Sequence, residues 1–206
     1  IKTPLTSIIN YVDLLQKEDI DNEKVREYLD VLDRQSSRLK KLIQDLLEAS
    51  KASTGSINVE LEELDAAVML SQVAGEYEEK FKKNKLDLMI KNDVTPLMIQ
   101  ADGRHLWRVF DNLMNNINKY AQPGTRLYID IIPKDSGAII TFKNVSATPL
   151  NISSDELKER FVRGDSSRNT EGSGLGLSIA ESLMKLMNGT LELTVDGDLF
   201  KVTLEF

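Results

Sequence analysis

The sequence has no cysteine, a single histidine and no apolar run long enough to cross a bilayer. The absence of cysteine excludes disulfides and thiolate chemistry, and gives no reason to expect secretion. One histidine, His105, cannot build a histidine-rich metal site. A membrane-spanning helix needs about 18 to 20 consecutive apolar residues, so we expect no membrane contact by this chain. No signal-peptide pattern opens it.

Basic charge is also scarce. The chain has 26 Lys and Arg against 33 Asp and Glu, a net charge of −7. Because nucleic-acid phosphates are bound by basic surfaces, we expect no nucleic-acid partner. The 206 residues suffice for one large or two small domains, and 41% hydrophobic content supports an ordinary core. Since the chain opens on Ile1 without Met, we expect a fragment of a longer protein.

Residues 1–53 show helical periodicity only. An apolar or small residue recurs every three or four positions along the second part of this region, which is typical of a helix bundle. These residues are Leu29, Leu32, Ser36, Leu39, Ile43, Leu46 and Ser50. A shorter apolar face precedes them, before a connector at residues 19–22: Leu5, Ile8, Ile9, Val12 and Leu15. A lone helical hairpin cannot bury both stripes, so we expect a homodimer through residues 1–53 that forms a four-helix bundle. Packing against the rest of the same chain is the alternative.

Strand and helix patterns alternate after a linker at residues 52–56. The sequence predicts strands at 56–60, 86–91, 97–100, 126–133, 138–144, 190–195 and 199–206. It predicts helices from the cap Asp65 to about Phe81, and at 103–121, 156–161 and 178–187, with a polar loop at 163–173. The expected fold is therefore α+β: a helical hairpin at 1–53, then a two-layer α/β sandwich at 54–206.

Two local patterns carry chemistry. Gly172, Gly174 and Gly176 precede a predicted helix, whose N-terminus offers unpaired N–H groups that suit phosphate. A tight turn before a core helix is the alternative interpretation. In the helix at 103–121, an amide stripe ending in a cation lies on one face: Asn112, Asn116 and Lys119. Amide oxygens suit Mg²⁺, while amide N–H groups and an ammonium suit phosphate, so the stripe favours a nucleoside triphosphate with Mg²⁺ over a chance polar face.

Four motifs together resemble those of sensor histidine kinases. Residues 112–120 resemble the N box, residues 159–164 the F box, and residues 171–177 the second glycine box. Residues 1–6 resemble the downstream half of the H box. The order and spacing also match, and the motifs span nearly the whole chain. The resemblance implies a dimerisation hairpin joined to an ATP-binding domain.

The resemblance implies roles for individual residues. Asn116 would coordinate Mg²⁺, Asn112 would help to hold the phosphates, and Lys119 would contact phosphate during transfer. Tyr120 would lie near the nucleotide. Other residues would form the lid and the phosphate end of the pocket: Phe161, Arg163, Gly172, Gly174, Leu175 and Gly176.

Two features depart from the family pattern. The first glycine box of the family is Asp-x-Gly-x-Gly, whereas residues 142–150 contain neither Asp nor Gly, and Asn144 stands at the Asp position. Its carbonyl oxygen can accept the hydrogen bond from the adenine amino group, without charge, so we expect weaker binding. The phosphorylated histidine of the family would lie two residues before Ile1, outside this chain. His105 does not replace it, and we expect a solvated or capping role there. Thr3 would orient water for dephosphorylation of the partner, or would cap a helix before Pro4.

The resulting hypothesis is the cytoplasmic kinase core of a membrane-anchored two-component sensor. ATP and Mg²⁺ would be its cofactors, and the receiver domain of a response regulator its partner. Three alternatives stay open. These are another ATPase of the same nucleotide fold, such as a type II topoisomerase or a mismatch-repair protein, a degenerate nucleotide-binding scaffold, and a helical interaction module.

Overall fold

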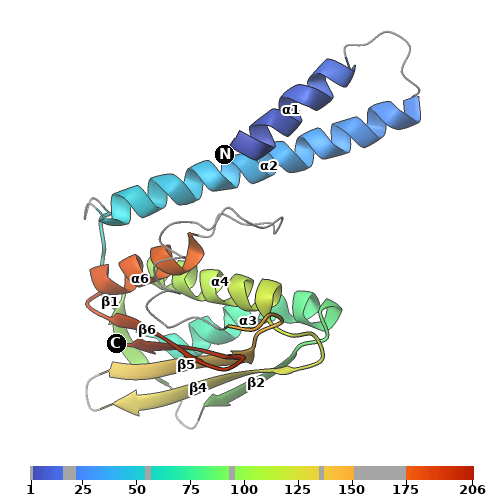
Figure 1. Ribbon diagram of the computed structural model, residues 1–206. Coiled ribbons are helices and arrows are strands. Elements are labelled where there is room, and N and C mark those ends of the chain that lie inside the picture. Colours follow the sequence, from blue (N-terminus) through green and yellow to red (C-terminus); the bar gives the residue numbers. More distant parts are fainter. Residues whose placement is uncertain (1, 16–21, 54–56, 93–95, 135–136, 151–174) are drawn as a thin grey trace.

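Figure 1 shows the computed structural model, which describes residues 2–15, 22–53, 57–92, 96–134, 137–150 and 175–206. Helices α1 (Lys2–Leu15) and α2 (Asn22–Ser53) form the expected hairpin. Their contact includes the rings of Tyr11 and Tyr28, whose centroids lie 5.2 Å apart. Helix α1 covers the first part of α2, and the later part of α2 lies over the α/β domain beside α6 (Figure 1).

The hairpin leaves many of its apolar side chains exposed in this single chain. Seven of them stay at least 38% accessible to solvent: Leu5, Ile9, Val12, Leu29, Ile43, Leu46 and Leu47. Both interpretations of the stripe therefore have support. Near its C-terminal end, α2 contacts the same chain, because Asp45 is buried and Ala49 packs against the core of the α/β domain. Elsewhere on the stripe, Leu32 and Leu39 are half-buried, whereas Leu29, Ile43 and Leu46 stay exposed.

The α/β domain has two layers. One is a five-stranded sheet in the order β2-β4-β5-β7-β6. Its strands are β2 (Asp87–Asn92), β4 (Arg126–Lys134), β5 (Gly137–Val145), β6 (Thr190–Asp196) and β7 (Leu199–Glu205). Strand β2 is parallel to β4, and the remaining pairs are antiparallel. The other layer consists of α3 (Ala66–Lys83), α4 (Gly103–Tyr120) and α6 (Gly176–Leu186), which cover one face of the sheet (Figure 1).

The core lies between these layers and follows the predicted periodicities. Apolar residues at helical spacing along α3 and α4 are buried, including Leu70 and Phe110. Phe110 of α4 and Phe142 of β5 meet with ring centroids 6.2 Å apart. Asp65 caps α3 as expected, since its carboxylate accepts the N–H groups of Ala67 and Val68.

The strand predicted at 56–60 is wrong. Residues 57–61 form no strand, and β1 (Glu62–Asp65) pairs instead with β3 (Met98–Ala101) in a separate two-stranded sheet. Ile57 and Val59 still pack against the core, which explains their apolar character. The N–H of Glu60 donates to the Asp102 carboxylate at 3.0 Å, so this backbone group is satisfied without a neighbouring strand.

Candidate functional site

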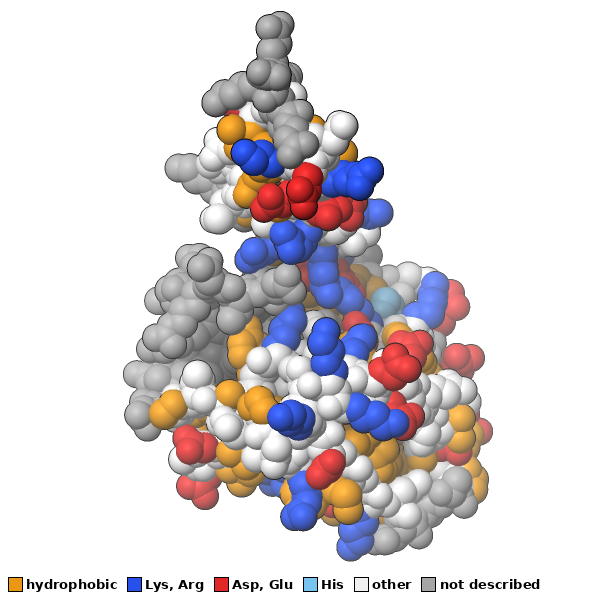
Figure 2. Space-filling model, turned by 90° about the vertical axis from the view of Figure 1, so that its right-hand side faces the viewer, with side chains coloured by type: hydrophobic (Ala, Val, Ile, Leu, Met, Phe, Trp, Pro, Cys, Tyr) orange, Lys and Arg blue, Asp and Glu red, His pale blue; other side chains and the backbone are white. Residues whose placement is uncertain are grey.

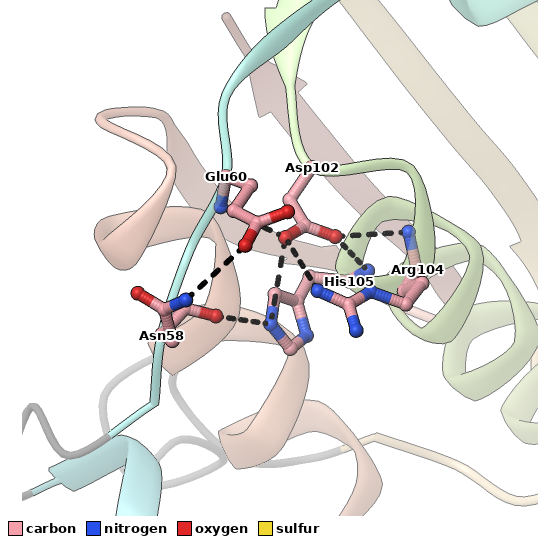
Figure 3. Close-up of polar contacts among 5 residues, drawn as sticks. All are labelled: Asn58, Glu60, Asp102, Arg104 and His105. Carbon is pink, nitrogen blue, oxygen red and sulfur yellow. Dashed lines mark hydrogen bonds and ion pairs between the residues drawn. The ribbon is translucent and has the colours of Figure 1, made fainter.

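Helix α4 begins at a well-defined cap. The Asp102 carboxylate accepts the N–H groups of Arg104 at 3.0 Å and His105 at 3.2 Å, which are donors that a helix start leaves unpaired. Figure 3 shows this cluster, with His105 directed toward the linker that carries Asn58 and Glu60. Burial acts to raise the pKa of the Asp102 carboxyl, but the N–H groups of Glu60, His105 and Arg104 and the charge of the His105 ring outweigh it. Its pKa therefore lies below the ordinary value.

His105 has neither of the two expected roles, because its side chain is not fully solvated and the cap of α4 is Asp102. Its side chain is 18% exposed, with Nε2 3.3 Å from the backbone oxygen of Asn58 and 3.9 Å from the Asp102 carboxylate. The ring thus holds the segment that follows α2 against the start of α4. His105 belongs to α4 and lies away from the apolar stripe of the hairpin.

The polar stripe of α4 changes from buried to exposed along the helix. Asn112 is buried, Asn116 is half-buried, and Lys119 and Tyr120 are exposed. The Asn112 side chain lies against the first turn of α6. A Cβ placed on Gly176 would lie 3.3 Å from Asn112 Oδ1, so a glycine permits this close approach. Helix α6 starts at Gly176 itself, two residues earlier than predicted.

Two buried amide atoms near this face have no hydrogen-bond partner among the described residues. They are Nδ2 of Asn112 and Oδ1 of Asn144. Asn112 is 8% exposed and Asn144 is 5% exposed. A buried polar atom without a partner costs about 1–3 kcal/mol, so such atoms indicate a missing partner. Here the missing partners are an acceptor for Asn112 and a donor for Asn144.

Asn144 has a fixed orientation. Its Nδ2 donates to the backbone oxygen of Val145 at 3.2 Å, which leaves Oδ1 as the available atom. Turning the amide over would set Oδ1 against that carbonyl oxygen. The end of β5 is tied to the end of α4, because Gln122 N donates to Val145 O and Ala147 N donates to Tyr120 O, both at 2.8 Å. The backbone therefore brings Asn144 to the end of the helix that carries Asn112 and Tyr120.

The remaining predicted site residues have varied placements. Leu175 is the residue before α6 and makes no side-chain cap there. Thr3 is exposed inside the first turn of α1, which begins at Lys2, so the alternative that Thr3 caps a helix before Pro4 is wrong. Several predicted residues and segments lie outside the described residues: Phe161, Arg163, Gly172, Gly174, the helix at 156–161 and the loop at 163–173.

One residue with a large structural role was missed in the sequence. Arg108 of α4 contacts Asp45 and Glu48 of α2, which lie at least 60 positions earlier in the chain. No local pattern indicates such a contact. The capping role of Asp102, in contrast, has a local signal, because an Asp directly before a predicted helix is a common cap.

Comparison with known proteins identifies the class of protein. Residues 1–55 match the family model of the His Kinase A (phospho-acceptor) domain. Residues 101–206 match the model of the histidine kinase-, DNA gyrase B- and HSP90-like ATPase. The chain is also 30% identical over 194 residues to the sensor protein VanSC of Enterococcus gallinarum, a match that covers 93% of this chain and 53% of VanSC. The chain therefore belongs to the sensor histidine kinases, a family of protein histidine kinases.

Other relatives agree. The sensor protein VanS of Enterococcus faecium is 30% identical over 199 residues, covering 93% of this chain and 50% of VanS. This chain thus spans about half the length of these two relatives. Among solved structures, the histidine kinase AdeS of Acinetobacter baumannii has a TM-score of 0.74 at 19% identity, over 100% of this chain and 95% of AdeS. The histidine kinase ThkA in complex with the response regulator protein TrrA also scores 0.74, at 20% identity over 99% of this chain and 58% of ThkA. These structures share the fold.

The match at residues 1–55 argues against one of the alternatives. A type II topoisomerase or mismatch-repair ATPase would not account for the phospho-acceptor domain at residues 1–55.

Among the helices of the described residues, none is long and apolar enough to span a bilayer. No cluster of three or more His, Cys, Asp or Glu side chains suited to a metal ion occurs in the described ranges.

Proposed function

We propose that this chain is the core of a sensor histidine kinase that binds ATP with Mg²⁺. It passes the γ-phosphoryl group to a histidine just upstream of residue 1, and from there to an aspartate of a response regulator. Residues 1–53 form the dimerisation and phosphotransfer hairpin, and residues 54–206 form the ATP-binding domain. The observation that carries this proposal is the pair of partnerless buried amide atoms, Asn112 Nδ2 and Asn144 Oδ1.

The base end of the nucleotide fits Asn144. The available Oδ1 is an acceptor, and the exocyclic amino group of adenine is a donor, so the two complete each other. A neutral amide replaces the family's carboxylate at this position. The hydrogen bond then lacks charge assistance, which accounts for recognition of adenine at reduced strength.

The phosphate end fits the two facing helices. Asn112 Nδ2 donates to a phosphate oxygen, Asn116 Oδ1 serves as a Mg²⁺ ligand, and the exposed Lys119 ammonium reaches phosphate from the end of α4. Gly176 places the N-terminal turn of α6 against Asn112, so its backbone N–H groups and the positive end of its dipole face the same region. Bound Mg²⁺ supplies charge neutralisation of the phosphates, and the chain supplies position.

The hairpin fits a homodimer and a response regulator. Its exposed apolar stripe needs a partner surface, and a second copy of the same hairpin completes a four-helix bundle. The regulator docks on the lower hairpin, around Ile8, Ile9, Tyr11 and Val12. ThkA shares the fold of this chain and was solved in complex with a response regulator, which supports a partner of that class. Thr3 is exposed in the first turn of α1, where it can orient water for dephosphorylation. The chain is then the cytoplasmic part of a membrane-anchored sensor.

Calorimetric titration with a non-hydrolysable ATP analogue, with and without Mg²⁺, tests the proposal. We expect binding that Mg²⁺ strengthens, and about a tenfold loss of that Mg²⁺-dependent affinity in Asn116→Ala. The matched control is Asn115→Ala, which makes the same change one position away on α4. Equal behaviour of the two variants would remove Asn116 from the metal site.

A nucleotide-binding scaffold without catalysis is the second candidate. The first glycine box favours it, because Asn144 replaces Asp and the glycines of that box are absent. A phosphotransfer assay with labelled ATP, on a chain extended to include the upstream histidine, separates the two functions. Nucleotide binding without transfer of the γ-phosphoryl group to that histidine would support the scaffold.

A further inference from the structure

The last turn of helix α4, residues 117–120, carries two of the proposed nucleotide residues. Lys119 and Tyr120 are both exposed there. The last four carbonyl groups of an α-helix have no partner in the helix itself, so they need donors from elsewhere. A helix end without such donors frays, and a frayed turn cannot hold a lysine in a fixed place. The donors to these four carbonyls therefore determine how well the phosphate end of the proposed site is positioned.

The chain that follows α4 satisfies one of these carbonyls and then turns away. Ala121 N donates to Ile117 O at 2.9 Å, as in a regular helix. The next N–H group is that of Gln122, which would be the regular donor to Asn118 O. Gln122 N donates instead to Val145 O at 2.8 Å, at the end of β5. The carbonyl of Asn118 therefore needs a donor from another element.

The end of the same turn is held from β5. Pro123 has no N–H, so the helix cannot continue through it. Gly124 N, the regular donor to Tyr120 O, donates to Lys85 O at 2.8 Å. Ala147 N takes its place and donates to Tyr120 O at 2.8 Å. One side of the turn is thus fixed by backbone groups of the neighbouring strand.

The other side of the turn is held from α3 by Asn84. Its Nδ2 donates to Asn118 O at 2.8 Å and lies 2.9 Å from Asn118 Oδ1. A peptide carbonyl can only accept, so the Asn84 amide must present its N–H side to Asn118. The backbone N–H of Asn84 also ends α3, because it donates to the carbonyls of Lys80 and Lys82. A single residue thus closes two helices, α3 with its backbone and α4 with its side chain.

The bond from Asn84 differs from the others because a substitution can remove it. Ala121 and Ala147 donate through backbone N–H groups, which every residue except proline supplies. Farther back along the same two helices, the Tyr77 hydroxyl donates to the Asp111 carboxylate at 2.6 Å. This second bond keeps α3 joined to α4 when Asn84 is changed. Loss of the Asn84 amide should therefore release the last turn of α4 and leave the rest of the helix in place.

The charges around this turn favour a polyanion. Helices α3 and α4 end on the same side of the α/β domain (Figure 1). Figure 2 faces that side and shows Lys and Arg side chains gathered over the domain. Lysines in the last turns of the two helices are Lys80, Lys82, Lys83 and Lys119. Because the whole chain has a net charge of −7, this local excess of positive charge sets the surface apart as one that attracts phosphate groups.

We propose that Asn84 is a positioning residue for nucleotide binding. Its side chain holds the last turn of α4 and thereby keeps the Lys119 ammonium where it meets phosphate. Binding to a released turn would first have to order the long Lys119 side chain, and that ordering lowers the affinity. This inference rests on the proposed function, because it concerns the same phosphate site.

Calorimetric titration of the whole chain with a non-hydrolysable ATP analogue and Mg²⁺ tests the inference in a double-mutant cycle. We expect Asn84→Ala to weaken binding about fivefold, as for the loss of a typical hydrogen bond. A Lys119→Ala chain has already lost the phosphate contact. Adding Asn84→Ala to it should change the affinity by less than about twofold, because the two residues act on one contact.

Two asparagine variants are the controls. Asn118→Ala removes the side-chain oxygen but keeps the backbone carbonyl that accepts from Asn84, so it should bind the analogue as the wild type does. Asn58→Ala is the same substitution beside the opposite end of α4 (Figure 3), where the amide donates to Glu60 at 3.4 Å. It should also leave the affinity unchanged. A loss in Asn118→Ala equal to that in Asn84→Ala would show that the carbonyl is not the group that matters.

Amide hydrogen exchange measured by nuclear magnetic resonance without nucleotide gives an independent readout. In Asn84→Ala, the Ala121 N–H should exchange at least about threefold faster, because its acceptor Ile117 O lies in the released turn. The Asn58→Ala chain should show no such change. Circular dichroism melting confirms that each variant is folded.

Three further results overturn the inference: wild-type affinity in a folded Asn84→Ala, additive losses in the double-mutant cycle, or unchanged exchange at Ala121. Each of them leaves nucleotide binding by the wild type, and with it the proposed function, intact. A wild type that does not bind the analogue would overturn the proposed function itself, and this inference with it. The two failures are therefore distinguishable.

Discussion

The hairpin and the α/β domain treat their apolar side chains in opposite ways. In the α/β domain, Leu70, Phe110 and Ile140 are completely buried between helices and sheet. In the hairpin, Leu29 and Leu46 remain half-exposed although they lie on a regular apolar stripe. The α/β domain completes its core within one chain. The hairpin has an apolar surface that only a partner can cover. The same residue types therefore indicate a folded core in the α/β domain and an assembly in the hairpin.

The largest expected effect tests the self-contained core. Phe110→Ala removes a fully buried ring that meets Phe142, and should lower the free energy of unfolding of the α/β domain by about 3–5 kcal/mol. Urea unfolding followed by circular dichroism measures it. Leu29→Ala is the control from the hairpin and should change the unfolding of the domain little. A similar loss of unfolding free energy in both variants would contradict the conclusion that the α/β domain has its own core, separate from the hairpin.

A substitution on the apolar stripe of the hairpin tests whether this surface forms the dimer. Leu29→Asp should weaken dimerisation at least about tenfold, because burying a Leu side chain contributes about 1.5–3 kcal/mol. Analytical ultracentrifugation over a concentration series gives the dimer dissociation constant. The melting of the α/β domain should stay unchanged. A wild-type chain that is monomeric at high concentration would remove the need for a second copy.

A smaller effect concerns the cap of α4, where the domain meets the linker. The pKa of Asp102 is lowered in the folded state, so its stabilisation is present above the unfolded pKa of about 4 and is lost as pH falls through the folded pKa. Asp102→Asn keeps an acceptor for the helix N–H groups but loses the charge. We expect a cost of about 1–2 kcal/mol at pH 7 that shrinks below about pH 4. A cost independent of pH would show that the charge is not involved.

The smallest effect sharpens the account of the nucleotide site. Asn144→Asp restores a charged acceptor, and should tighten binding of an ATP analogue by about 1 kcal/mol, or roughly fivefold. Calorimetry at fixed Mg²⁺ measures it. The variant loses the bond from Asn144 Nδ2 to the Val145 carbonyl, so the carboxylate must turn away from that oxygen, which still accepts Gln122 N. Weaker binding by Asn144→Asp would mean that the base does not contact this position.

Structural features that depend on residues close in the sequence were predictable. The helix at 103–121, the cap at Asp65 and the strands at 190–195 and 199–206 rest on local signals, and the structure confirms them. The strand predicted at 56–60 is wrong because the N–H of Glu60 donates to the Asp102 carboxylate and not to a neighbouring strand. That carboxylate lies more than 40 positions away in the sequence. The contacts of Arg108 with Asp45 and Glu48 were missed for the same reason.

The candidate site was predictable in residue type but not in detail. The spacing of Asn112 and Asn116 indicates one helical face. It does not reveal that Gly176 lies against Asn112, because that depends on the packing of α6 on α4. Likewise, the resemblance implied that Asn144 is an acceptor, whereas the direction of its amide follows from the Val145 carbonyl beside it.

The most direct test is a crystal structure of the chain with Mg²⁺ and a non-hydrolysable ATP analogue. We expect the adenine amino group within hydrogen-bond distance of Asn144 Oδ1, a phosphate oxygen within the same reach of Asn112 Nδ2, and Mg²⁺ coordinated by Asn116 Oδ1. A nucleotide bound elsewhere, or one that leaves both amide atoms without partners, would contradict the account.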